Sequence, residues 1–214
     1  MSFYIFDMDG TLLDTMPYWR NIFPLYADLH GLKIPEIKEE DILKAEEMPT
    51  YKGLEFLKQI YPVPAVQNID EKAVLEVIKK AYETNSPLKN GVAKFLHSLS
   101  KQNVKMCVIS ATPTYLVKIA LEKAKISKYF DFILTPDDYP KGKADPEIFK
   151  AAAERFGCDT QEITVFEDAL YSMKVAKNLG MKVIAVKDKY EQRNFQEISK
   201  IADRFIDDFT ELKR

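Results

Sequence analysis

Cysteine is scarce in this sequence, which has only two among its 214 residues. Cys107 and Cys158 stand in apolar surroundings without C-x-x-C spacing. This arrangement predicts buried thiols and argues against a disulfide framework or a cysteine metal site. A reducing, cytoplasmic compartment fits best.

Long apolar runs are also missing. Charged residues interrupt every apolar stretch well short of the roughly 20 residues that a transmembrane helix requires. Near the amino end, Asp7 and Asp9 fall where an export signal would have its apolar segment. We therefore expect a soluble protein without an export signal and without a membrane partner.

Neither sign of charge dominates, because 31 Lys and Arg residues face 33 Asp and Glu residues and the formal net charge is -2. The two signs are interspersed, so the basic surface typical of nucleic-acid binding is missing and no nucleic-acid partner is expected. We find no internal repeat and no low-complexity segment. The length suits one α/β domain with an insertion, or two small domains.

Six short segments rich in β-branched and aromatic residues have the pattern of strands. They are Phe3–Phe6, Val104–Ile109, Phe132–Leu134, Ile163–Phe166, Lys182–Val186 and Arg204–Ile206. Helical periodicity separates the later strands, at Thr114–Lys125, Pro146–Phe156 and Ala169–Leu179. Strands that alternate with helices predict an α/β fold with a doubly wound parallel sheet.

A stretch of about ninety residues separates the first two predicted strands and contains no convincing strand. Helical patterns fill it, at Tyr18–Leu29, Tyr51–Gln59, Asp70–Glu83 and Gly91–Lys101. We assign residues 16–87 to an inserted α-helical cap. Residues 1–15 and 88–214 then form the sheet-bearing core.

Ligands of open parallel sheets bind beyond the carboxyl ends of the strands, so the polar residues there are the first candidates for a site. Four places qualify and are expected to assemble one site. They are Asp7-Met8-Asp9-Gly10-Thr11, Ser110-Ala111-Thr112, Lys143 and Glu167-Asp168.

The first of these places carries two carboxylates one residue apart. A turn that caps the next helix would explain Asp9 or Thr11, but it gives no reason for Asp7 at the buried end of a strand. A carboxylate can attack phosphorus and form an aspartyl-phosphate, while a second acid protonates the leaving oxygen. We assign Asp7 as the nucleophile and Asp9 as the general acid and base, and the amides of Met8 and Asp9 can face phosphoryl oxygens.

Carboxylates beside a phosphate need a cation, and oxygen ligands of this kind suit Mg2+. The expected ligands are the Asp7 and Asp168 side chains, the Asp9 carbonyl and waters, with Glu167 among the ligands or directly behind them. Taken alone, Glu167 and Asp168 fit equally well as acidic residues at the start of a helix, where the helix dipole favours them.

Ser110 and Lys143 complete the predicted site. The Ser110 hydroxyl and the following amide of Ala111 can bind a phosphoryl oxygen, although a serine also serves as a helix cap. Lys143 can offset the negative charge of a phosphoryl group, whereas the plain alternative is a solvated lysine. Lys141 is a neighbouring competitor for this role.

The order of these motifs resembles the haloacid dehalogenase-like hydrolase superfamily, in the branch with β-phosphoglucomutase and phosphoglycolate phosphatase. The resemblance covers the whole chain and favours Lys143 over Lys141. It implies a Rossmann-like core, a helical cap inserted after the first motif, and hydrolysis of a small-molecule phosphomonoester. We expect a monomer or a weak dimer.

Some positions depart from the family pattern. Ala144 stands where proline is frequent, and Ala169 and Ser172 replace a serine and a glycine that commonly follow the acidic pair. The segment Met16–Arg20 lacks the histidine typical of the mutases, and no clear counterpart of their phosphate-gripping cap arginine is found. These differences favour a phosphatase, and they leave a sugar-phosphate mutase and a noncatalytic binding protein as alternatives.

Several cap residues are possible substrate contacts, although aromatic residues at helical spacing more often pack in a core. They are Tyr18, Trp19, Arg20, Tyr51 and Lys52. Lys52 also raises the possibility of a phosphonatase, which its neighbours in the sequence do not support.

Overall fold

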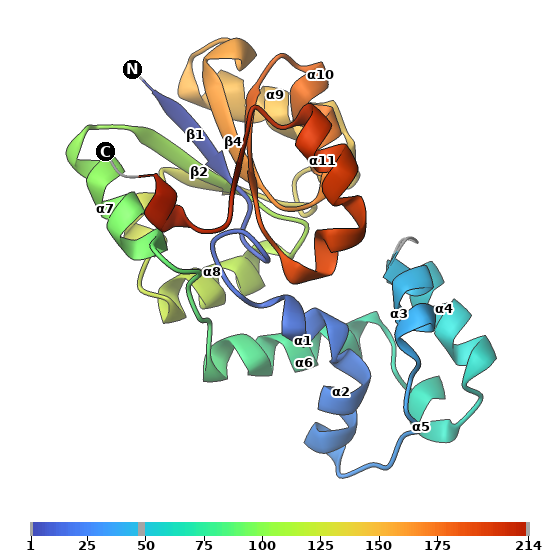
Figure 1. The fold of residues 1–214 in the computed structure, drawn as a ribbon. Helices are drawn as coiled ribbons and strands as arrows, with labels where there is room; N and C mark the ends of the chain where they lie inside the picture. Colours follow the sequence, from blue (N-terminus) through green and yellow to red (C-terminus); the bar gives the residue numbers. More distant parts are fainter. Residues whose placement is uncertain (1, 47–49, 213–214) are drawn as a thin grey trace. The chain divides into compact units, whose positions relative to one another are not determined.

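The computed structural model describes residues 2–46 and 50–212. Contacts within the chain divide it into two compact units (Figure 1). The first, here called the sheet unit, consists of Met1–Thr15 and Asn85–Arg214, and the second, the helical unit, is Met16–Thr84. The insertion expected from the sequence extends to residue 87, slightly beyond the second unit.

The sheet unit contains a six-stranded sheet with the order β3-β2-β1-β4-β5-β6. All neighbouring strands are parallel, which confirms the predicted doubly wound α/β fold. The strands are β1 Phe3–Phe6, β2 Lys105–Ile109, β3 Phe132–Leu134, β4 Ile163–Glu167, β5 Lys182–Val186 and β6 Arg204–Ile206. β2 and β3 lie on one side of β1, and β4, β5 and β6 lie on the other, so β1 lies between β2 and β4.

Helices and short 3-10 turns connect the strands of this unit. The helices are α7 Val92–Lys101, α8 Thr114–Lys123, α9 Pro146–Phe156, α10 Leu170–Asn178 and α11 Phe195–Ile201. The 3-10 turns are η1 Ser127–Tyr129, η2 Gly142–Ala144, η3 Thr160–Glu162, η4 Lys189–Asn194 and η5 Phe209–Glu211. The sequence pattern predicts α7 to α10 closely but misses α11, because its seven residues contain too few turns to show a clear period.

Both faces of the sheet are buried, as parallel sheets require. One face carries a mainly aliphatic cluster that includes Ile5 and Val165 of the central strands. Side chains of α9, α10 and α11 cover this face, and Figure 1 shows these three helices grouped together. Strands buried on both faces read as continuous apolar runs, which explains why the strands are well predicted from the sequence.

The opposite face of the sheet is aromatic. Phe6 of β1 stacks on Phe166 of β4 with 4.6 Å between ring centroids and an interplanar angle of 11°. Phe95 of α7 contacts the Phe166 ring at 5.5 Å and the Phe209 ring of η5 at 5.5 Å. These rings connect α7 and the C-terminal turn to the two strands that end in the acidic motifs.

The helical unit is built from six helices among the described residues. They are α1 Met16–Arg20, α2 Ile22–His30, α3 Glu39–Glu46, α4 Thr50–Ile60, α5 Pro64–Gln67 and α6 Glu71–Thr84. The single helix predicted over Tyr18–Leu29 is wrong, because the chain breaks at Asn21 into α1 and α2. Pro24 explains the break, since it has no N–H to donate to the carbonyl of Arg20.

The first helix of this unit packs on its last helix. Trp19 Nε1 donates a hydrogen bond to the Tyr82 hydroxyl at 3.1 Å, and the Tyr18 and Tyr82 rings lie 6.4 Å apart. Tyr82 and Arg20 are buried. Tyr18 and Trp19, which are half-buried, thus pack on Tyr82 within the helical unit. The side chains of Tyr51 and Lys52 lie outside the described residues.

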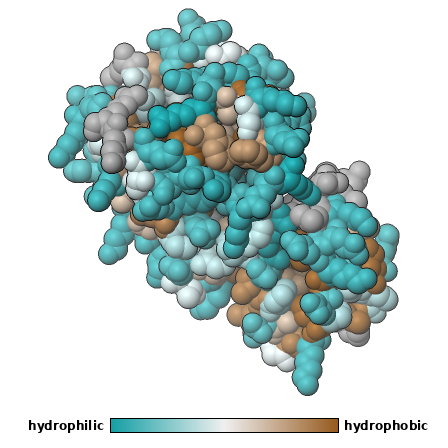
Figure 2. All heavy atoms as spheres, viewed as in Figure 1, coloured by the Kyte–Doolittle hydropathy of each residue, from teal (hydrophilic) through white to brown (hydrophobic). Residues whose placement is uncertain are grey.

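Most of the surface seen in Figure 2 is hydrophilic, in line with the 30% of charged residues. No helix in the described part of the chain is long and apolar enough to cross a membrane. Both cysteines are free thiols: Cys107 is buried as expected, whereas Cys158 is only half-buried because it follows the end of α9.

We predict that Phe95→Ala lowers the free energy of unfolding by about 3–5 kcal/mol, because it removes a buried ring that contacts three other aromatic rings. The control is Phe195→Ala, whose ring is 49% exposed and should cost less than about 1 kcal/mol. Urea unfolding followed by circular dichroism measures both. Equal losses of unfolding free energy in the two variants would contradict the conclusion that the aromatic rings form the core of this face.

Candidate active site

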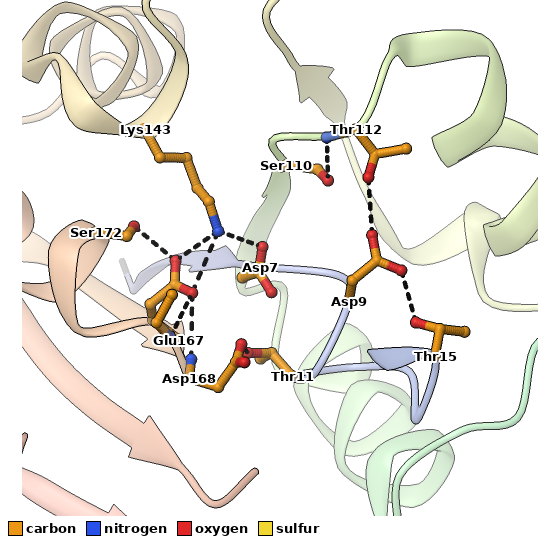
Figure 3. Close-up of polar contacts among 11 residues, drawn as sticks. Asp7, Asp9, Thr11, Thr15, Ser110, Thr112, Lys143, Glu167, Asp168 and Ser172 are labelled. Carbon is orange, nitrogen blue, oxygen red and sulfur yellow. Dashed lines mark hydrogen bonds and ion pairs between the residues drawn. The ribbon is translucent and has the colours of Figure 1, made fainter. Parts of the chain in front are cut away.

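The four polar places predicted from the sequence meet at the carboxyl edge of the sheet (Figure 3). β1 leads into Asp7, β2 into Ser110, and β4 ends at Glu167. β2, β1 and β4 are neighbours in the sheet, so their ends are adjacent in space. Every residue of this group belongs to the sheet unit.

Lys143 is at the centre of the group. It lies in η2, and its side chain is only 4% exposed. Its Nζ donates to Asp7 Oδ1 at 2.5 Å and to Glu167 Oε2 at 3.0 Å. Lys141, the alternative considered from the sequence, is instead exposed and pairs with Asp145.

The Asp7 carboxylate is buried, and the described residues supply a hydrogen-bond donor to one of its two oxygens. Lys143 engages Oδ1, whereas Oδ2 has no hydrogen-bond partner among the described residues. A buried carboxylate oxygen without a donor is costly, so this atom is suited to contact a cation or an electrophile. Asp7 also has its backbone fixed, because its amide donates to the Phe166 carbonyl at 2.9 Å.

Asp7, Glu167 and Asp168 can each offer one carboxylate oxygen, and these oxygens lie within 4.8 Å of one another. All three residues are buried. Oxygen ligands at this spacing fit a hard divalent cation such as Mg2+. The fit is better for Asp7 and Asp168 than for Glu167, because Glu167 is already occupied by donors of the protein.

Glu167 accepts hydrogen bonds on both oxygens. Oε1 accepts from the amides of Asp168 at 3.2 Å and Ala169 at 3.1 Å, and Oε2 accepts from the Ser172 hydroxyl at 2.6 Å. With Lys143 as a further donor, this carboxylate is arranged to hold the lysine. Of the two positions expected for it, the one behind the metal ligands therefore suits it better.

Asp168 is held close to the loop that follows β1. Thr11 Oγ1 donates to Asp168 Oδ1 at 2.8 Å. Gly10 has a φ of +87°, and a Cβ at this position would lie 2.3 Å from Asp168 Oδ2. Any side chain at position 10 would therefore collide with the carboxylate, which explains the glycine between Asp9 and Thr11.

Asp9 is turned away from Lys143 and is held by two hydroxyl groups. Thr15 Oγ1 donates to Asp9 Oδ1 at 2.6 Å, and Thr112 Oγ1 donates to Asp9 Oδ2 at 2.9 Å. The sequence pattern assigns no role to Thr15 or Thr112. Thr112 belongs to the polar end of β2, which was its only signal, and no local pattern identifies Thr15.

Ser110 is buried at the end of β2, and its Oγ accepts a hydrogen bond from the Thr112 amide at 3.1 Å. The hydroxyl proton is therefore available to another acceptor. Ala111 is exposed beside it. Met8 has a fully buried side chain, so only its backbone groups can take part in a site.

The electrostatics of the group follow from three buried carboxylates around one buried ammonium group. Burial and the neighbouring Glu167 raise the pKa of Asp7 to about 7, although Lys143 opposes the rise. Burial and Asp7 raise the pKa of Asp168 well above its ordinary value. For Lys143, burial lowers the pKa, but Asp7 and Glu167 outweigh it and raise the pKa above the usual value. The site holds surplus negative charge that a divalent cation would offset.

The chain is similar to known proteins over most of its length. Residues 4–186 match the family model of the haloacid dehalogenase-like hydrolases. A phosphorylated carbohydrates phosphatase of Thermotoga maritima is 28% identical over 86% of this chain and 84% of its own length. Hexitol phosphatase B of Escherichia coli K12 is 26% identical over 97% of this chain and 92% of its own length.

A similar fold is found among solved structures. A candidate β-phosphoglucomutase from Thermotoga maritima superposes with a TM-score of 0.79 at 25% sequence identity. The match covers 96% of this chain and 94% of the other.

We predict that Asp7→Asn stabilises the metal-free protein at pH 8. The folded state holds a proton on Asp7 up to a pKa of about 7, whereas the unfolded chain releases it near the ordinary value of 3.8. The wild type therefore loses stability as the pH rises from about 4 through 7, and the variant escapes this loss. We expect a gain on the order of 2 kcal/mol, because the relief of the buried negative charge is partly offset by the loss of a partner of Lys143.

Urea unfolding in EDTA at pH 5 and pH 8 measures this difference, and exposed Asp14→Asn from the same loop is the control. Added Mg2+ should then stabilise the wild type more than Asp7→Asn. A variant that is less stable than the wild type at pH 8 would contradict the surplus of negative charge at the site.

Proposed function

We propose that this chain, which belongs to the haloacid dehalogenase-like hydrolase family, hydrolyses a small-molecule phosphomonoester with Mg2+ through an aspartyl-phosphate on Asp7. The observation that carries the proposal is the Asp7 carboxylate, which is buried and fixed by Lys143 on one oxygen and without a partner on the other. A group fixed in this way is oriented for attack before the substrate arrives. The relatives named as phosphatases support the reaction class.

The side chains of Asp7 and Asp168 and the backbone carbonyl of Asp9 would hold the metal. When bound, Mg2+ would neutralise charge on the transferring phosphoryl group and on the carboxylates. The unpartnered Asp7 Oδ2 and the raised pKa of Asp168 support this assignment. Glu167 stays behind the ligands because Lys143, Ser172 and two amides already engage it.

The first half of the reaction forms a bond between an Asp7 oxygen and phosphorus. The bond from phosphorus to the substrate's bridging oxygen breaks, and Asp9 gives its proton to that leaving oxygen. Lys143 offsets charge on the phosphoryl group, while the Ser110 hydroxyl and the amides of Met8, Asp9 and Ala111 donate to its oxygens.

The second half releases inorganic phosphate. Asp9, now ionised, accepts a proton from water as the water oxygen attacks phosphorus, and the bond from phosphorus to Asp7 breaks. The enzyme returns to its starting state with Asp7 ionised and Asp9 protonated. Thr15 and Thr112, which hold the Asp9 carboxylate, orient it for both proton transfers.

A sugar-phosphate mutase remains the second candidate, because the chain is similar to the candidate β-phosphoglucomutase of Thermotoga maritima. In a mutase, a second hydroxyl of the substrate accepts the phosphoryl group in place of water. The predicted insertion 16–87 would act as the cap over the substrate in either case. A cytoplasmic location and a monomer or weak dimer stay predictions from the sequence.

We predict phosphate release from sugar phosphates and polyol phosphates that depends on Mg2+ and falls by at least about 100-fold in Asp9→Asn, since proton transfer to the leaving oxygen is lost. Colorimetric phosphate assays with and without EDTA measure it, and Asp14→Asn is the matched control. Sugar-phosphate isomerisation faster than phosphate release would favour the mutase. Mg2+ binding without turnover of any phosphate ester would favour a noncatalytic binding protein.

A further inference from the structure

Ser172 is a buried hydroxyl that touches the site from behind. It lies in the first turn of α10 and is 0% exposed. Its Oγ donates to Glu167 Oε2 at 2.6 Å, and Figure 3 shows it on the far side of Glu167 from Asp7. We propose that Ser172 is a positioning residue, whose hydroxyl fixes the Glu167 carboxylate and through it places Lys143 beside Asp7. The proposal rests on the proposed phosphatase function.

The two oxygens of Glu167 accept hydrogen bonds from different sets of donors, so loss of the Ser172 hydroxyl affects one oxygen more than the other. Oε1 accepts from two backbone amides as well as from Lys143. Within the described residues, Oε2 accepts from Lys143 and Ser172. Without the Ser172 hydroxyl, Oε2 would keep Lys143 as its one partner among the described residues, while the two backbone amides would still anchor Oε1, so the carboxylate plane could rotate about Oε1.

A rotation of Glu167 changes the position of Lys143. The ammonium group bridges Asp7 and Glu167, so its place is set by the balance of the two carboxylates. If Oε2 turns away, the ammonium group of Lys143 loses its contact with this oxygen and keeps its contact with Asp7. It then lies closer to the Asp7 carboxylate and farther from the position of the phosphoryl group. A misplaced ammonium group weakens mainly the stabilisation of the transition state, because the charge on the transferring phosphoryl group must be offset most accurately there.

A purely structural role for Ser172 predicts something different. A buried serine whose hydroxyl only completes the packing of α10 would lower stability when removed, with no selective effect on turnover. The two roles therefore differ in whether kcat falls in a variant that keeps its fold.

The test compares Ser172→Ala with the wild type and with Thr160→Val. Thr160 is a matched control in the sheet unit, because its hydroxyl also donates a short hydrogen bond, at 2.6 Å to the Leu179 carbonyl, but outside the site. We expect Ser172→Ala to lower kcat about 10-fold or more, as for a hydrogen bond to a charged group, with KM changed less than about threefold. Thr160→Val should keep both parameters.

Two further measurements make the proposal falsifiable. In a Lys143→Met background, Ser172→Ala should cause no further loss of residual kcat, because the residue acts through Lys143. Crystal structures should show the Glu167 carboxylate rotated and the distance from Lys143 Nζ to Oε2 lengthened in Ser172→Ala. The crystallographic comparison needs no turnover, so it tests Ser172 even if the wild type hydrolyses nothing and the proposed function itself fails.

An unchanged kcat in folded Ser172→Ala would overturn the proposal. The proposal would also fail if Ser172→Ala lowered kcat by the same factor in the Lys143→Met background as in the wild type. An unmoved Glu167 and Lys143 in the variant crystal structure would overturn it as well.

Discussion

The arrangement of the site depends on one buried ammonium group among three buried carboxylates. Lys143 bridges Asp7 and Glu167, while Asp168 lies beside them with no ion pair to a lysine in the described part of the chain. Because the lysine cannot neutralise all three acids, burial leaves the group with surplus negative charge. Burial, followed by the neighbouring carboxylates, raises the pKa values of Asp7 and Asp168. A divalent cation and a phosphoryl group are the partners that such a site can accept together.

The sheet makes this arrangement possible. β1 lies between β2 and β4 in the sheet. Because the chain returns to the centre of the sheet after α9, Glu167 at the end of β4 lies next to Asp7, although the two are 160 positions apart in the sequence. The Phe6 and Phe166 rings stack one residue before the acids and hold the two strand ends in register. Apolar packing beneath the acids thus supplies the rigidity that the charged groups above require.

The sequence predicts the strands and most helices of the sheet unit, because buried parallel strands are apolar runs bounded by turns. It predicts Asp7, Lys143 and Glu167-Asp168 as neighbours from their places at strand ends, and the structure brings them together. It could not predict that Thr15 and Thr112 hold Asp9, or that Ser172 holds Glu167. These are single hydroxyl groups whose partners depend on side-chain geometry across elements, and no local pattern encodes such contacts. The break at Asn21 is not predicted because Pro24 overrides a periodic pattern, and α11 is not predicted because its seven residues contain too few turns to show a period.

Asp7 is tested as the nucleophile by mass spectrometry of the protein quenched in acid during turnover, followed by peptide mapping. We expect the added mass of one phosphoryl group on the peptide that contains Asp7, dependent on substrate and Mg2+ and missing in Asp7→Asn. Sustained phosphate release without any labelled peptide, or a label on a different residue, would contradict Asp7 as the nucleophile.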